Sequence, residues 1–142
     1  MAVEKRASAV WSGSLLEGSG TVSSGSGVLA DVAVSWPKRS EQGAEATSPE
    51  ELIAAAHATC FSMALAHGLS QAGTPPEELR VTATVGFQPG QGITGSHLDV
   101  EGRVPGLDDQ AFRDAATTAA QNCPVSKALS GIQISHEARL AG

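Results

Sequence analysis

Tyrosine is absent from this 142-residue sequence, and all aromatic residues together make up only 4% of it. Because aromatic side chains supply much of the buried area of small cores, a single copy of the chain has little large apolar surface to bury. The sequence is rich in alanine and contains 16 glycines. This composition favours an oligomer whose core is shared between chains. The length is that of one domain, and we predict a single domain over residues 1–142.

An excess of basic residues is also absent. The sequence has 9 Lys and Arg against 15 Asp and Glu, and its formal net charge is −6. Nucleic-acid binding needs a basic patch, and a membrane-binding surface usually carries a block of like charges, so neither class is favoured. The N-terminus shows no signal-peptide pattern, and the apolar stretch around Cys60, which contains His57 and His67, is too short to span a bilayer. We expect a cytoplasmic protein with no nucleic-acid or membrane partner.

Cysteine is nearly absent too, since Cys60 and Cys123 are the only two. They are not in a CxxC spacing, which excludes a thioredoxin-type motif and a four-cysteine zinc site. In the cytoplasm such cysteines rest as thiols unless they turn over catalytically. A disulfide between them remains possible if the fold brings them together. Cys60 taken alone is better explained as a small buried hydrophobe, the commonest fate of a free thiol.

The clearest element in the sequence is a helix over residues 49–71. Ser48 can cap it, Pro49 suits its first position, and Glu51 stands three residues after the cap, which is the spacing of a capping box. The residues that follow are mostly apolar and carry Cys60. We predict a buried central helix that holds this thiol, with the rest of the chain packed around it.

Short alternating runs divided by Gly and Ser clusters predict strands on both sides of this helix. A three-stranded β-meander is expected over residues 7–36, with its third strand at 28–36. After the helix we expect strands at 80–87 and 96–104 joined by a hairpin loop at 88–95, helices at 109–122 and 124–129, and a strand at 132–140. The order βββ-α-ββ-α-β predicts an α+β fold.

Several side chains could carry chemistry. Cys123 precedes Pro124 and occupies the expected N-cap of a helix, where the helix dipole lowers the pKa of a thiol. His57 and His67 fall on the same helical stripe as Cys60, so a Cys–His pair or a metal site is conceivable. A metal would need a further ligand from elsewhere. His57 fits better as an interior side chain that makes a local hydrogen bond.

The two carboxylates at the helix start have different explanations. Glu51 is accounted for by the capping box, whereas Glu50 is free to face another partner, and Arg39 in the preceding loop is the obvious one. Such a pair is either a surface ion pair of little energetic value or part of a site. Glu50 and Cys60 are about 15 Å apart along one helix. If Glu50 is catalytic, we therefore expect it to serve Cys60 of a partner subunit across a two-fold axis.

Two segments resemble the signatures of the OsmC/Ohr family of thiol-dependent peroxidases. They are residues 47–65 around Cys60 and the run Cys123-Pro124-Val125-Ser126. The amino-terminal Trp11-Ser12-Gly13 and the position of His57 resemble the OsmC branch. The resemblance implies an OsmC-like fold, a tightly intertwined homodimer with active sites at its interface, and reduction of organic hydroperoxides, with hydrogen peroxide reduced more weakly.

The resemblance also implies roles for individual residues. Cys60 would be the peroxidatic thiolate and Cys123 the resolving thiol that forms a disulfide with it. Arg39 would stabilise the thiolate, with Lys38 as the alternative cation, and Glu50 would orient the arginine. No metal and no bound cofactor is expected, and an external dithiol, of the lipoyl type, would reduce the disulfide.

Two other interpretations stay open at this stage. One is a non-enzymatic dimeric thiol protein that senses redox state or binds a small molecule. A catalyst needs the arginine–glutamate pair beside the thiol, whereas a passive binder does not. The other is a metal-binding domain that uses His57, Cys60 and His67.

Overall fold

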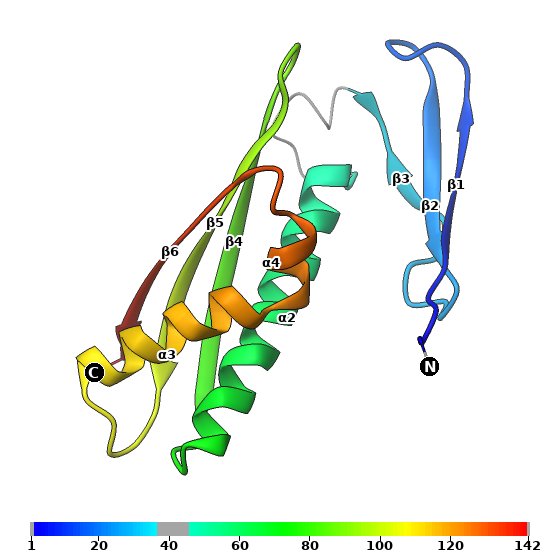
Figure 1. Cartoon of the computed structure of the whole chain (residues 1–142). Coiled ribbons are helices and arrows are strands. Elements are labelled where there is room, and N and C mark those ends of the chain that lie inside the picture. Colours follow the sequence, from blue (N-terminus) through cyan, green and yellow to red (C-terminus); the bar gives the residue numbers. More distant parts are fainter. Residues whose placement is uncertain (1, 37–45, 142) are drawn as a thin grey trace. The chain divides into compact units, whose positions relative to one another are not determined.

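The computed structural model describes residues 2–36 and 46–141 and confirms the predicted α+β class. Figure 1 shows two sheets and the helices that accompany them. The chain divides into two compact units, with the boundary between Leu52 and Ile53. The prediction of one domain over the whole chain stays a prediction. In chain order the elements are β1 (Ala7–Ser12), β2 (Ser19–Ser24), β3 (Val32–Val34), α2 (Pro49–Gln71), β4 (Glu78–Gln88), β5 (Gly92–Arg103), α3 (Asp109–Asn122), α4 (Pro124–Ala128) and β6 (Gln133–Leu140).

The first unit contains the predicted meander, an antiparallel sheet in the order β1-β2-β3. Its third strand is shorter than the predicted 28–36, because the chain turns before Val32. Asp31 has a positive φ of 49°, which interrupts an extended strand. The Asp31 backbone N–H donates to Ser23 Oγ at 2.9 Å, and the Ser23 hydroxyl donates to the Asp31 carboxylate at 3.3 Å. These two hydrogen bonds hold the turn.

The second unit is built on the sheet β4-β5-β6, in which β4 and β5 form an antiparallel hairpin and β6 runs parallel to β5. The hairpin is longer than predicted, since β5 already begins at Gly92 within the expected loop. A parallel neighbour cannot be reached by a tight turn. The chain reaches it through α3 and α4, which connect β5 to β6 (Figure 1).

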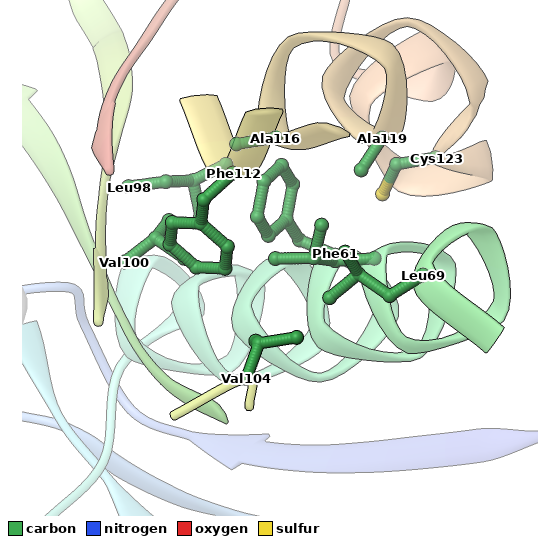
Figure 2. Packing of buried hydrophobic residues seen from close by; sticks show 10 residues of the cluster. Phe61, Leu69, Leu98, Val100, Val104, Phe112, Ala116, Ala119 and Cys123 are labelled. Carbon is green, nitrogen blue, oxygen red and sulfur yellow. The ribbon is translucent and has the colours of Figure 1, made fainter. Parts of the chain in front are cut away.

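The core of this unit lies between one face of the sheet and the helices α2 and α3 (Figure 2). Leu98 and Val100 of β5 are fully buried, whereas His97 and Asp99, which alternate with them, point to the other face. This alternation confirms that one face of the sheet is covered. Each fully buried side chain of this size contributes about 1.5–3 kcal/mol through burial alone. The buried cluster is Phe61, Leu65, Leu69, Leu98, Val100, Val104, Phe112, Ala116, Ala119 and Cys123.

The start of α2 differs in one respect from the predicted capping box. Ser48 Oγ accepts a hydrogen bond from the Glu51 backbone N–H at 3.1 Å, as expected for an N-cap. The Glu51 carboxylate does not complete the box in the expected way. It accepts a hydrogen bond from the Thr47 hydroxyl at 2.9 Å instead. Thr47, which is itself buried, thus takes the role predicted for the Ser48 backbone N–H.

Within one chain α2 buries a single face. His57, Phe61, Leu65 and Leu69 follow one another at intervals of four residues and are all buried, whereas Met63 is 68% exposed. By length and composition alone α2 is long and apolar enough to cross a membrane, contrary to the expectation that its apolar stretch is too short. Its buried face packs on β5 and α3, as that of a core helix does.

Candidate active site

The fold brings the two cysteines together. Cys60 lies midway along α2 and is partly buried, and Cys123 is fully buried at the junction of α3 and α4. Both are free thiols, and each lies close enough to the other to shift its pKa. Figure 2 shows Cys123 at one end of the buried cluster with its sulfur turned toward α2. The pairing that the sequence left open is therefore sterically available.

The local sequence explains the position of Cys123. A residue before proline avoids the helical region, and Cys123 is extended, with φ −63° and ψ 119°. Its backbone N–H still donates to Ala119 O at 2.8 Å and ends α3. Pro124 then occupies the first position of α4. The Cys-Pro dipeptide thus makes a sharp corner between two helices, and the thiol sits at that corner.

The two thiols differ in acidity. Burial raises the pKa of Cys60, and the Cys123 side chain raises it further, while the backbone N–H of Val125 lowers it, so that the pKa lies above its ordinary value. Burial also raises the pKa of Cys123. Hydrogen bonds from the Ser126 backbone and hydroxyl, from Cys60 and from the Val125 backbone outweigh this effect and bring it below its ordinary value. This agrees with the acidity expected for Cys123 from its place at a helix start.

Cys60 therefore needs a nearby positive charge to ionise readily. Arg39, predicted to supply it, lies outside the described residues, and so does the alternative Lys38. Glu50 lies in the first turn of α2 and is 6% exposed. Because α2 is one continuous helix from Pro49 to Gln71, Glu50 stays about 15 Å along the axis from Cys60 of its own chain.

His57 is an interior side chain, as the sequence predicted, but its hydrogen bonds reach distant segments of the chain and are not the expected local one. It is fully buried, with Nδ1 2.7 Å from Ser96 Oγ and Nε2 2.8 Å from Ser126 Oγ. Burial lowers the pKa of His57, so the ring is neutral at pH 7. Neither Ser96 nor Ser126 is indicated by the sequence as a partner of His57. The one available signal was Ser126, which stands three residues after Cys123 in the family-like motif.

The metal-binding interpretation is not supported by this arrangement. Both ring nitrogens of His57 are engaged by hydroxyls, which leaves none for a metal. In the part of the chain that the structure describes, no three His, Cys, Asp or Glu side chains are grouped so as to hold an ion.

An open groove of about 640 Å³ adjoins Cys60. It lies between α2 and α3 and reaches the start of α4. Most of its lining is apolar, and the polar side chains among its walls are His67, Thr118 and Asn122. The remaining lining residues are Met63, Ala64, Gly68, Ala72, Ala115, Ala119 and Pro124. The groove gives an apolar molecule of moderate size a place beside the Cys60 thiol.

Comparison with known proteins identifies the family. Residues 41–137 match the family model described as OsmC-like protein, a segment that includes Glu50, Cys60 and Cys123 and begins after Arg39. The chain is 42% identical over 132 residues to peroxiredoxin OsmC of Escherichia coli (strain K12), covering 91% of this chain and 92% of that protein. It is 32% identical over 90 residues to an organic hydroperoxide resistance protein of Xanthomonas axonopodis pv. citri (strain 306), covering 63% of each.

The fold is that of the same family. An OsmC-like protein from Mycoplasma pneumoniae superposes with a TM-score of 0.75 over the full length of both chains, at 17% identity. This likeness concerns the fold alone. Together with the family match and the E. coli relative, it shows that the chain belongs to the OsmC family and is a peroxidase-type oxidoreductase.

Proposed function

We propose that the protein reduces organic hydroperoxides, and hydrogen peroxide more weakly, to alcohols through Cys60 and Cys123. The observation that carries this proposal is the pair of neighbouring thiols beside an apolar groove. A thiol pair within reach of one another can cycle between dithiol and disulfide. An apolar groove beside one of the thiols provides room for the alkyl part of a substrate, which hydrogen peroxide lacks.

In this proposal Cys60 reacts first. Its thiolate attacks the distal peroxide oxygen, the O–O bond breaks, and the alkoxide leaves and takes up a proton as an alcohol. Cys60 becomes a sulfenic acid. The Cys123 thiolate then attacks the Cys60 sulfur, a disulfide forms, and hydroxide leaves and is protonated to water. An external dithiol, of the lipoyl type, reduces the disulfide, and no bound cofactor takes part.

The reactive ionisation of Cys60 is proposed to depend on a second copy of the chain. Arg39 would stabilise the thiolate and Glu50 would orient Arg39. Since Glu50 is about 15 Å from Cys60 along its own helix, the partner's helix is the better source of this carboxylate. A homodimer would also cover the exposed face of α2, on which Met63 lies. The protein is proposed to act in the cytoplasm.

The test is dithiol-dependent consumption of cumene hydroperoxide, compared with hydrogen peroxide, by wild type, Cys60→Ser and Cys123→Ser. We expect Cys60→Ser to abolish turnover and Cys123→Ser to permit the first turnover but impair recycling. Loss of the first turnover in Cys123→Ser alone would reverse the two roles. If the wild type consumes neither peroxide with any dithiol, the protein is a redox-sensing or small-molecule-binding thiol protein and the proposal is wrong.

A further inference from the structure

We propose that Ser96, His57 and Ser126 form a hydrogen-bonded relay that holds the Ser126 hydroxyl on Cys123 and so prepares this thiol to attack the Cys60 sulfenic acid. The inference rests on the proposed function, in which Cys123 is the resolving thiol. Ser126 contacts the reacting sulfur. His57 and Ser96 act through it and are positioning residues.

The geometry connects three elements of the second unit. Ser96 lies on β5, His57 on α2 and Ser126 on α4, and their exposed fractions are 2%, 0% and 6%. The two His57 contacts measure 2.7 Å and 2.8 Å, both short for hydrogen bonds of this kind. Beyond them, Ser126 stands three residues after Cys123, the N-cap of α4, and its side chain is among the groups that lower the pKa of the Cys123 thiol. The relay thus runs from the sheet through the central helix to the thiol.

The protons along the relay can point only one way if Ser126 serves the thiolate. A serine hydroxyl has a single proton, so Ser126 must accept from His57 Nε2–H when it donates to Cys123. Nδ1 of the neutral ring is then the acceptor, and the Ser96 hydroxyl must donate to it. Every hydrogen bond is thereby directed toward the sulfur. Hydrogen bonds aligned in this way polarise one another in a low-dielectric interior.

A purely structural role explains less of this arrangement. Burying an imidazole and two hydroxyls is costly unless all are paired, and apolar side chains would fill the same space at no such cost. His97 and Ser135 make a similar pair at 2.7 Å on the other, more exposed face of the sheet. That pair provides a matched control for the effect of removing a His–Ser hydrogen bond.

The relay residues supply no atoms or electrons to the resolving step. The Cys123 thiolate forms the S–S bond, the S–O bond of the Cys60 sulfenic acid breaks, and the leaving hydroxide is neutralised to water by the proton that the Cys123 thiol released on ionising. The contribution of Ser126 is to stabilise the thiolate before attack. Among the residues that the structure describes, the titratable groups that face Cys123 are Cys60 and, through Ser126, His57, both on α2.

The first experiment titrates Cys123 in the full-length Cys60→Ser protein by thiolate absorbance at 240 nm, a readout that does not require access for a reagent. We expect Ser126→Ala to raise the measured pKa by about one pH unit, a tenfold loss of thiolate at neutral pH. Ser96→Ala and His57→Gln should shift it in the same direction by less. Ser135→Ala should not shift it. An unchanged titration in folded Ser126→Ala and His57→Gln proteins would overturn the proposal.

The second experiment follows a single turnover in the protein that retains both cysteines. With one equivalent of cumene hydroperoxide, Ser126→Ala should form Cys60 sulfenic acid at the wild-type rate but the disulfide about tenfold more slowly, in proportion to the lost thiolate. Equal slowing of both steps would contradict a role confined to Cys123. If the wild type consumes no peroxide while Ser126→Ala still shifts the Cys123 titration, the proposed function fails and the relay to the thiol is supported.

Discussion

Cys60 and Cys123 lie close enough for each to shift the pKa of the other, and the two shifts are opposite, because Cys123 raises the pKa of Cys60 whereas Cys60 lowers that of Cys123. Cys123 receives hydrogen bonds from α4 that favour its thiolate. Burial and Cys123 itself disfavour the thiolate of Cys60. The thiol proposed to react first is thus the one that the described residues leave less acidic. For Cys60 to be the more acidic thiol, a positive charge from outside the described residues has to lower its pKa.

This relationship predicts a selective effect of Arg39. In Arg39→Gln we expect the pKa of Cys60, measured by thiolate absorbance in the Cys123→Ser protein, to rise by about one pH unit or more, because an opposite charge within a few ångströms has an effect of this size. The pKa of Cys123, measured in the Cys60→Ser protein, should not change. Lys38→Gln is the control, and a larger effect of Lys38→Gln would identify that residue as the cation instead.

The proposed sharing of Glu50 between subunits predicts complementation. Glu50→Gln and Cys60→Ser should each be nearly inactive as homodimers. After denaturation and co-refolding in equal amounts, half of the dimers are mixed, and each mixed dimer has one site with both Cys60 and an intact Glu50 from the other chain. We expect about a quarter of the wild-type activity to return, the statistical share of intact sites. A mixture as inactive as its components would place Glu50 and Cys60 of the same chain in one site.

Gly102 is predicted to be intolerant of any side chain. A Cβ at this position of β5 would lie 2.5 Å from Cζ and 2.7 Å from Cε1 of Phe112, which is fully buried in the core. Gly102→Ala should therefore lower the free energy of unfolding by about 1–3 kcal/mol, as overpacking does. Gly131→Ala, whose Cβ would meet nothing within 4 Å, should change it by about 0.5 kcal/mol or less. Urea denaturation of both variants measures the difference.

The buried His57 predicts a loss of stability in mild acid. Its pKa in the folded protein lies below the ordinary value of 6.5, so the unfolded chain binds more protons than the folded one once the pH falls below that value. The free energy of unfolding therefore decreases as the pH falls through this range. His57→Gln should flatten the decrease between about pH 7 and 5, even if it lowers stability at pH 8. A wild-type slope in His57→Gln would contradict this prediction.

Elements with strong local signals could be predicted from the sequence. Asp108 caps α3 by accepting from the Ala111 backbone N–H at 2.8 Å, and Pro124 ends one helix and begins another, as expected. Both depend on residues within one turn. The predicted limits of α2, 49–71, also match the structure, because a cap and an unbroken apolar run define them.

Contacts between distant segments could not be predicted in the same way. Nothing in the spacing of residues indicates that β6 pairs in parallel with β5, or that Ser96 and Ser126 meet on the two sides of His57. Such contacts depend on how complete elements pack. Local hydrogen bonds that compete with an expected one could not be predicted either. The Thr47 hydroxyl donates to the Glu51 carboxylate, which the capping box would have paired with the Ser48 backbone N–H. The pairing of Cys60 with Cys123 was implied by family resemblance and not by spacing.

The parallel pairing of β5 and β6 has a consequence for assembly of the thiol pair. Cys123 lies on the crossover that joins these two strands, whereas Cys60 lies on the helix that precedes the hairpin. The β4–β5 hairpin can form from neighbouring residues, but β6 can dock only after the crossover has traversed the sheet. The two thiols meet only when the crossover packs on α2, and we therefore expect a Cys60–Cys123 disulfide to form only after that packing. A chain that has not completed it would expose both thiols singly to oxidants.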